Sequence, residues 1–201
     1  MKKSTTGLVV WFCGLPGSGK STIAEGVLAK SSALSKTITL ISMDSIRKKL
    51  FPNPTYSDQE RDAAYRSFVL IASVLSKSGI TTLLDGTGHR LKWRNFAREE
   101  CPRFVEVYVK CPVDICIRRE TNRMNQKNDV RKKLYDDALN RLHSGKNIVG
   151  LGSVPGVDEP FEESPHPEII LDSSKDTPDA LVNKVIQELG KFESDVFSEK
   201  R

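Results

Sequence analysis

A glycine-rich segment near the N-terminus constrains the fold of this chain more than any other feature. Residues 8–13 form an apolar run with the length of a buried strand, and residues 14–21 read GLPGSGKS directly after it. An amphipathic helix is expected next, because Ile23, Val27 and Leu28 fall on one face. The glycine-rich pattern and its place between a strand and a helix together argue against a chance glycine-rich turn. The sequence therefore predicts a phosphate-binding loop that holds a nucleoside triphosphate.

Each part of this loop has a physical role in binding phosphate. Glycines let backbone N–H groups turn inward around an anion, and the N-terminus of the helix adds the positive end of its dipole. Lys20 can reach the β- and γ-phosphates, and Ser21 can be a ligand of Mg²⁺. The predicted nucleotide-binding residues of the loop are Gly14, Leu15, Pro16, Gly17, Ser18, Gly19, Lys20, Ser21 and Thr22.

Composition limits the class of protein. With 201 residues, 38% hydrophobic and 28% charged, the chain is expected to be one globular domain, residues 1–201. The basic and then apolar N-terminus imitates a signal peptide, but the apolar run is short and continues into the phosphate loop. No run approaches membrane-spanning length, so no membrane is expected as a partner.

The spacing of the cysteines and the net charge further limit the ligands and partners expected for this chain. The four cysteines lack the spacing of a metal site and are expected to be free thiols, buried at Cys13, Cys111 and Cys116, in a reducing cytoplasm. The net charge of +5 suits a polyanionic ligand. Because the basic residues are scattered along the chain, a small phosphorylated molecule explains them without nucleic acid.

Strand and helix patterns alternate along the chain. This alternation predicts an α/β fold in which a parallel sheet of five strands carries helices on both faces. Asp44 and Ser45 are candidate N-caps of the second helix, and residues 57–60 read as a capping box for the third. Besides residues 8–13, strands are expected at 37–43, 80–84, 104–109 and 168–171, and later helices at 44–50, 57–77, 91–100, 113–123 and 177–192.

The ends of these strands point to one site. In a parallel sheet, ligands bind beyond the carboxyl ends of the strands, so Gly14, Asp44, residues 85–87 and residues 110–111 should converge. Residues 124–167 are polar, with at most one helix near 130–142, and are too long for an ordinary connection. We interpret them as a mobile lid over the site.

Asp44 and Arg47 are candidates for the reaction centre. A carboxylate at the end of the second strand can order Mg²⁺ through water or accept a proton from an acceptor hydroxyl. Arg47, one helical turn later, can bind an acidic acceptor with two hydrogen bonds. An N-cap beside a surface arginine is the structural alternative, and the position at the strand end favours the functional one.

Several other polar residues have competing interpretations. Arg61 and Arg66 lie about 140° apart on their helix, so each can equally belong to a solvated face. Thr87 is a candidate contact to the acceptor, whereas His89 is expected to be a partly exposed residue at a helix start. Arg90 and Arg94 belong to the turn at the end of the third strand. Three arginines precede the predicted lid (Arg118, Arg119 and Arg123), and Arg131, Lys132 and Lys133 lie inside it. A closing basic lid would supply cations to the phosphates and exclude water, and a charged mobile loop is the structural alternative.

The chain resembles the adenylylsulfate kinase family along nearly its whole length. GLPGSGKSTIA at 14–24 resembles the family's GLSGAGKSTIA, and DSIR at 44–47 resembles the end of its D-G-D-N-V-R. YSDQER at 56–61 resembles F-S-x-x-D-R, and GVDEPFE at 156–162 resembles G-I-D-D-P-Y-E. Further matches are FVEVYV at 104–109, Cys116 with Arg119, KLYDDA at 133–138, and residues 165–172. The motif at 156–162, together with residues 165–172, is far more specific than the phosphate loop.

The resemblance implies a function and a set of site residues. It implies a P-loop kinase fold and transfer of phosphate from ATP, with Mg²⁺, to the 3′-hydroxyl of adenosine 5′-phosphosulfate. Lys20 and Asp44 would be catalytic, with Asp44 and Ser21 at the metal. Arg119 would lie over the ATP adenine, and a homodimer is compatible with the family. The implied acceptor-binding residues are Arg47, Tyr56, Arg61, Thr87, Arg90 and Lys133, with Tyr56 stacked on the acceptor adenine.

The departures from the family pattern lie on the acceptor side and leave alternatives open. Ser42 stands for the first aspartate of D-G-D, and Ala64 stands for an asparagine. Residues 84–90 replace F-I-S-P-Y-R, and residues 152–156 replace K-G-F-T-G. A related kinase that acts on another hydroxyl (a modified nucleotide, a small metabolite or a polynucleotide 5′-end) remains an alternative. A non-catalytic nucleotide-binding regulator is an alternative of another class.

Overall fold

The computed structural model describes residues 6–32, 37–127, 135, 138 and 153–192. Within these residues, five strands form one sheet in the order β2-β3-β1-β4-β5, and every neighbouring pair is parallel. The strands are β1 Val9–Cys13, β2 Ile38–Ser42, β3 Thr81–Asp85, β4 Phe104–Lys110 and β5 Ile169–Asp172. The predicted α/β fold with a five-stranded parallel sheet is confirmed.

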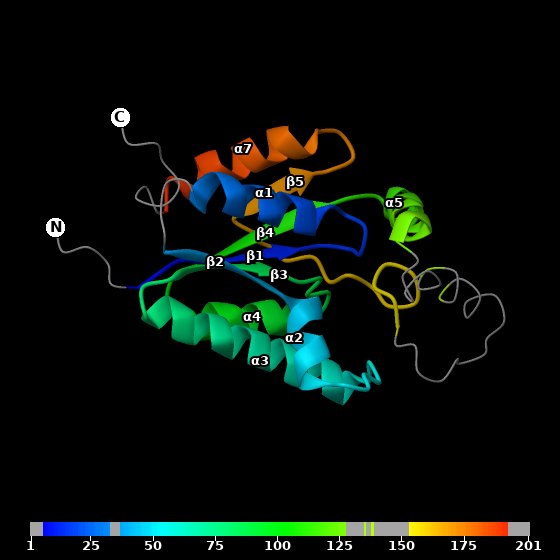
Figure 1. Cartoon of the computed structure of the whole chain (residues 1–201), viewed down its shortest axis with the longest axis horizontal. Coiled ribbons are helices and arrows are strands. Elements are labelled where there is room, and N and C mark those ends of the chain that lie inside the picture. Colours follow the sequence, from blue (N-terminus) through cyan, green and yellow to red (C-terminus); the bar gives the residue numbers. More distant parts are fainter. Residues whose placement is uncertain (1–5, 33–36, 128–134, 136–137, 139–152, 193–201) are drawn as a thin grey trace.

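Helices cover both faces of this sheet. Helices α1 and α7 lie on one face, and α3 and α4 lie on the other, with α2 beside α3 (Figure 1). The described helices are α1 Lys20–Ser32, α2 Met43–Leu50, α3 Asp58–Lys77, α4 Leu91–Glu100, α5 Val113–Lys127 and α7 Pro178–Leu189. No helix in the described ranges is long and apolar enough to span a membrane.

Strand β1 explains why the sheet is buried on both faces. Its side chains alternate, so Val10 and Phe12 enter the core under α1 and α7, whereas Val9 and Trp11 enter the core over α3 and α4. All five residues of β1 are buried. The apolar run at 8–13 is therefore what a central parallel strand requires.

The carboxyl ends of the strands are aligned. Ser42 pairs with Asp85, and Lys110 at the end of β4 pairs with Asp172 at the end of β5. The loops that follow these ends lie at the right-hand end in Figure 1, together with the yellow segment 153–163. We call this part of the molecule the carboxyl edge.

Some predicted boundaries differ from the observed ones. Helix α2 begins at Met43 with Ser42 as its N-cap, and Ser42 makes no side-chain capping bond. The expectation that Asp44 or Ser45 caps this helix was wrong, because β2 ends one residue before Met43 and the chain turns directly into the helix. Ser57 and Thr177 do cap α3 and α7 with their side chains. Helix α7 ends at Leu189, before the predicted 192, and α5 continues to Lys127, beyond the predicted 123.

Two expectations are not settled by the described residues. Apart from 135 and 138, the predicted helix at 130–142 lies outside them, as does most of the predicted lid before residue 153. The assignment of residues 1–201 to a single domain stays a prediction.

Candidate active site

Glycines shape the loop between β1 and α1. Gly14, Gly17 and Gly19 have φ of 144°, 79° and 92°. A Cβ on Gly14 would lie 2.5 Å from the carbonyl oxygen of Val109, and one on Gly17 would lie 2.4 Å from that of Cys116. The loop backbone therefore packs directly against β4 and α5, and a larger residue would displace it.

Polar groups of the loop are arranged to receive an anion. Lys20 begins α1, and its Nζ lies 3.4 Å from the carbonyl oxygen of Leu15, so the ammonium group folds back across the loop. The Oγ of Ser18 is buried and has no hydrogen-bond partner among the described residues. Ser21 and Thr22 lie in the first turn of α1, where the N–H groups of a helix lack intrahelical partners. This geometry suits phosphate.

Ser173 is a residue of this site that the sequence reasoning missed. It follows β5 directly, and its hydroxyl donates to the carbonyl oxygen of Ser18 at 2.7 Å. Arg119 on α5 donates to Ser173 Oγ at 3.1 Å and to Ser173 O at 2.7 Å. Arg119 is thereby held beside the phosphate loop. The rule that ligands bind beyond strand ends would have identified Ser173, had it been applied to the fifth strand.

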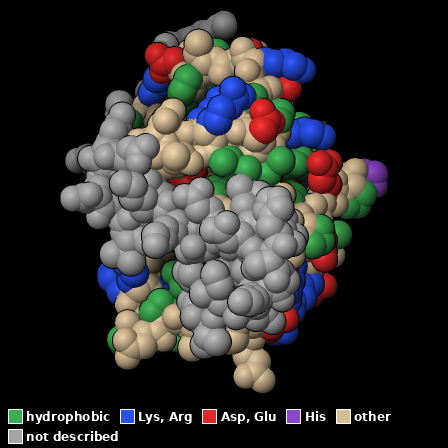
Figure 2. Space-filling model, turned by 90° about the vertical axis from the view of Figure 1, so that its right-hand side faces the viewer, with side chains coloured by type: hydrophobic (Ala, Val, Ile, Leu, Met, Phe, Trp, Pro, Cys, Tyr) green, Lys and Arg blue, Asp and Glu red, His purple; other side chains and the backbone are tan. Residues whose placement is uncertain are grey.

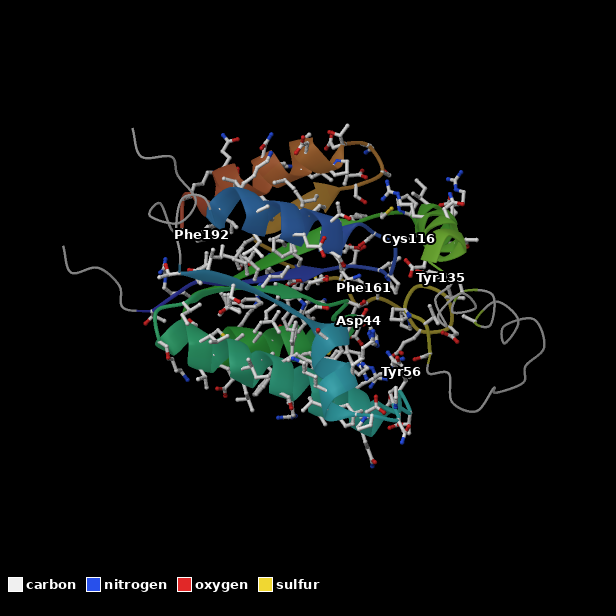
Figure 3. All side chains as sticks on the ribbon, viewed as in Figure 1. Asp44, Tyr56, Cys116, Tyr135, Phe161 and Phe192 are labelled. Atoms are coloured by element: carbon white, nitrogen blue, oxygen red, sulfur yellow. The ribbon has the colours of Figure 1, made fainter. Side chains whose placement is uncertain are left out.

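The loop is also contacted by residues from the predicted lid. The Tyr135 hydroxyl donates to the carbonyl oxygen of Pro16 at 2.7 Å. Burial raises the pKa of Tyr135, so this phenol keeps its proton. Tyr135 packs in a small apolar cluster with Ala138 and Val154. In Figure 3, Tyr135 lies at the end of the molecule that also carries Cys116, Asp44 and Tyr56, far from Phe192.

Helix α2 presents the predicted acceptor side. Asp44 is exposed in its first turn, and Arg47 is buried one turn later. The Arg47 guanidinium donates to Glu60 at 2.8 Å and lies 5.0 Å from the centre of the Tyr56 ring. Arg47 is thus a paired, stacked side chain and not the surface arginine of the structural alternative.

Tyr56 has an unusual backbone conformation. Its φ of 54° lies in the left-handed region, which a bulky residue seldom adopts. Glu60 accepts hydrogen bonds from the N–H groups of Thr55 and Tyr56 and from the Thr55 hydroxyl. Burial alone would raise the pKa of Glu60, but the bonds from Thr55 and Arg47 outweigh it and lower this pKa. The carboxylate therefore stays charged and holds Tyr56 in place.

Arg61 is the buried arginine of helix α3. Its Nε donates to Tyr56 O at 3.0 Å, and its Nη2 donates to Ser153 O at 2.6 Å. Arg90, at the start of α4, donates to Asp58 at 2.6 Å and to Glu159 at 2.8 Å. The structure therefore brings Arg47, Tyr56, Arg61 and Arg90 into one connected cluster.

Two residues after β3 join this edge. The Thr87 carbonyl oxygen accepts from the N–H of Gly14 at 3.2 Å, which places Thr87 beside the phosphate loop. His89 is 1% exposed, so the expectation of a partly exposed histidine was wrong. Burial lowers the pKa of His89 to about 4, so its imidazole is neutral at pH 7. It is buried because residues 153–163, from a distant part of the chain, cover it. The alternation of apolar residues in the sequence could not predict where this segment lies.

Residues 153–163, which we call the strap, are fixed to the sheet through aromatic contacts. The Phe161 ring stacks on the Tyr108 ring, with 5.2 Å between the ring centres. The Arg94 guanidinium lies 5.0 Å from the centre of the Phe161 ring. Arg94 is fully buried and pairs with Glu106 at 2.9 Å. Arg94 therefore has a structural role beneath the strap.

The remaining predicted residues do not join the cluster. Arg66 is exposed and pairs with Asp62, and Arg118 is exposed and pairs with Asp114. Lys133, Arg131 and Lys132 lie outside the described residues. Figure 2 views the carboxyl edge from outside, and its visible Lys and Arg side chains lie among Asp and Glu side chains.

All four cysteines are buried free thiols, as expected for three of them. In the described parts of the chain, no three His, Cys, Asp or Glu side chains gather into a metal-binding group. A metal ion at the carboxyl edge would therefore be held by a few protein oxygen atoms together with the bound ligand.

The sheet order, the phosphate loop between β1 and α1 and the polar residues gathered at the carboxyl edge define a P-loop kinase. Residues 6–172 match the family model described as adenylylsulphate kinase. The chain belongs to the adenylylsulphate kinase family.

Individual relatives agree with this assignment. A protein named probable adenylyl-sulfate kinase from Archaeoglobus fulgidus is 34% identical over 167 residues, which cover 83% of this chain and 96% of that protein. A namesake from Pyrococcus abyssi is 32% identical over 92% of this chain and 97% of its own length. The Mycobacterium tuberculosis APS kinase CysC, solved with AMPPNP and APS, has a TM-score of 0.72 at 25% identity, covering 92% of this chain and 98% of that one.

Proposed function

We propose that this protein transfers the γ-phosphate of ATP to the 3′-hydroxyl of adenosine 5′-phosphosulfate. One observation carries the proposal beyond family membership. The phosphate loop after β1 and the cluster of Arg47, Tyr56 and Arg61 after β2 lie at the same edge of the sheet. A donor site and an acceptor site at one edge are what in-line transfer between two nucleotides needs.

On the donor side, residues 14–22 would hold the phosphates of ATP through backbone N–H groups. Lys20 would neutralise charge on the transferred group, and Arg119 would lie over the adenine. The orphaned Ser18 hydroxyl gives the loop one more group that a ligand can satisfy. These roles explain why the loop backbone is held so closely against β4 and α5.

Mg²⁺ fits the oxygen ligands present. Magnesium takes one or two protein oxygens together with water and phosphates, so a Ser21 hydroxyl and an Asp44 carboxylate are enough. When bound, the ion neutralises charge on the phosphates. Asp44 would also accept the proton of the attacking hydroxyl, because it is exposed at the end of β2.

On the acceptor side, the Tyr56 ring would stack on the adenine. The Arg47 guanidinium lies over the same tyrosine ring. Arg61 and Arg90 would orient the 5′-phosphosulfate, together with Thr87 and Lys133. The proposal also includes a cytoplasmic location, a single domain with a lid at 124–167, a small-molecule acceptor without nucleic acid, and a homodimer.

The test is ADP release with ATP and a panel of acceptors. Adenosine 5′-phosphosulfate should accelerate release, and Lys20→Ala should reduce the rate about a thousandfold or more, because it removes the cation at the transferred phosphate. Lys30→Ala, on the same helix but exposed and paired with Asp179, should leave the rate unchanged.

The same panel tests the alternatives. Ala64 stands where the family pattern has an asparagine, so α3 lacks that amide group. This observation favours a second candidate, a kinase for another hydroxyl acceptor. Acceleration by a sugar, a modified nucleotide or a polynucleotide 5′-end, with none by adenosine 5′-phosphosulfate, would replace our first choice. Nucleotide binding without acceleration by any acceptor would indicate a regulator.

A further inference from the structure

The carboxyl end of β3 carries a carboxylate beside the place where the family pattern has one on β2. The family's D-G-D puts two aspartates at the end of the second strand, where this chain has Ser42 and Asp44. Residues 84–90, which replace the family's F-I-S-P-Y-R, bring in Asp85. Ser42 is the Cα partner of Asp85 in the pairing of β2 with β3. Because neighbouring strands lie about 4.8 Å apart, Asp85 is one strand away from the position of the missing aspartate.

The side chain of Asp85 lies on the face of the sheet that α1 covers. Asp85 is the Cα partner of Phe12 on β1, and such partners project to the same face of a parallel sheet. Phe12 belongs to the core under α1 and α7, together with Leu83, two residues before Asp85. Lys20 and Ser21 begin α1 on this face. Asp85 and the predicted magnesium ligand Ser21 are therefore on the same side of the sheet.

The residues after Asp85 hold it between the phosphate loop and α2. The carbonyl oxygen of Thr87 accepts from the N–H of Gly14 in the loop at 3.2 Å. A Cβ on Gly86 would lie 3.3 Å from that of Met43, the first residue of α2. Asp85 thus stands where the phosphate loop and the start of α2 meet, and it is only half-buried there.

We propose that Asp85 is a further residue of the magnesium site and replaces the aspartate that β2 lacks. The inference rests on the proposed function, because that function brings Mg²⁺ to Ser21 and Asp44. Magnesium keeps several of its waters in proteins, and carboxylates accept hydrogen bonds from such waters. A second negative charge also attracts the ion more strongly than one alone. Asp85 supplies that charge from β3.

Binding of the ATP analogue AMPPNP, measured by titration calorimetry with Mg²⁺ and with EDTA, tests this role without any reaction. In the wild type, Mg²⁺ should tighten binding. Asp85→Asn should weaken binding with Mg²⁺ at least about tenfold, the effect of losing a carboxylate beside a metal. Binding in EDTA should stay the same or become tighter, because the variant removes a negative charge near the phosphates. A carboxylate that only stabilised the turn would affect binding equally in both conditions.

An exchange between the two strand ends sharpens the test. Ser42→Asp combined with Asp85→Ser returns the carboxylate to β2, so AMPPNP with Mg²⁺ should bind within about threefold of the wild type. Asp85→Ser alone should behave as Asp85→Asn. The control is Asp114→Asn, which removes an exposed carboxylate paired with Arg118 and should match the wild type in both conditions.

Several outcomes would overturn the inference. They are unchanged binding with Mg²⁺ in Asp85→Asn, equal weakening with Mg²⁺ and with EDTA, and an exchange variant that binds no better than Asp85→Ser. A wild type whose binding of AMPPNP ignores Mg²⁺ would overturn it as well. A wild type that binds AMPPNP with Mg²⁺ but does not phosphorylate adenosine 5′-phosphosulfate refutes the proposed acceptor, and the binding measurements then decide the role of Asp85 alone.

Discussion

Arginine side chains in one stretch of this chain have different roles because each has a different partner. Arg47 and Arg94 are both buried, but Arg47 pairs with Glu60 next to Tyr56, whereas Arg94 pairs with Glu106 beneath the strap. Arg66 is exposed and pairs with its helical neighbour Asp62. Both buried guanidinium groups lie 5.0 Å from the centre of an aromatic ring, so their carboxylate partners and places in the fold distinguish them. Arg47 belongs to the cluster on the predicted acceptor side, whereas Arg94 has a structural role beneath the strap.

The substitution Arg47→Lys tests the role of this single side chain at the acceptor site. A lysine keeps the positive charge beside Glu60 but loses the planar group over the Tyr56 ring, so KM for the acceptor should rise about tenfold while KM for ATP stays the same. Steady-state kinetics with each substrate varied in turn measure both constants. Arg66→Lys is the matched control, and it should behave as the wild type. Equal values for Arg47→Lys and the wild type would remove Arg47 from the acceptor site.

At the scale of elements, the strap carries the most specific family motif. Its contacts are to α3, α4 and β4, and they come from Ser153, Glu159 and Phe161. The motif thus anchors the C-terminal part of the predicted lid, which precedes β5. It holds a path of irregular backbone against the sheet.

Tyr135→Phe tests the contact between the lid residues and the phosphate loop. The substitution keeps the ring in its apolar cluster but removes the hydrogen bond to Pro16, so KM for ATP should rise about fivefold. Nucleotide titration and steady-state kinetics measure the change. Tyr108→Phe, which loses a hydrogen bond to Glu163 outside the loop, serves as the control. If both variants match the wild type, Tyr135 does not support the loop.

At the scale of the whole molecule, the free energy of unfolding is set by two apolar cores on opposite faces of one sheet. Charged groups are buried where the elements meet at the carboxyl edge and under the strap. Glu106, for example, is 1% exposed and is shared by Arg94 and Arg98. Removing one partner of such a pair leaves a buried charge unbalanced and lowers the free energy of unfolding.

His89 gives a pH dependence with a defined sign. Its pKa falls from 6.5 in the unfolded chain to about 4 in the folded protein, because burial and the positive charges of Arg61 and Arg90 disfavour the charged form and outweigh the opposite effect of Glu159. Between these values the unfolded state binds more protons, so the free energy of unfolding decreases as pH falls from 6.5 to 4, by up to about 3 kcal/mol. Above pH 6.5 this contribution is constant.

Urea unfolding at several pH values measures this slope. His89→Gln does not titrate and should lose the part of the slope that lies between pH 6.5 and 4. His166→Gln, at an exposed position, should keep the wild-type slope. Glu159 causes a separate loss of stability below pH 4.5. Burial raises its pKa, but bonds from Ser153 and Arg90 outweigh this effect and hold the pKa at about 2. This second loss should remain in both variants. A wild-type slope in His89→Gln would contradict the assignment.

Much of the fold could be predicted because it depends on local patterns. The run at 8–13 and the loop after it determine a central strand and a helix start from neighbouring residues alone. Errors occurred at boundaries such as Met43, where pairing of Ser42 with Asp85 decides the end of β2. His89 was misjudged because its cover comes from residues about seventy positions later.

The sequence by itself determined the donor loop, the parallel sheet and the edge at which the site lies, because backbone periodicity and glycine spacing act over a few residues. Only the tertiary structure decided which arginine pairs with which carboxylate, that Ser173 joins the phosphate loop, and that the strap buries His89. Those contacts join residues far apart in the chain, and burial and charge at such contacts depend on all the elements that meet there.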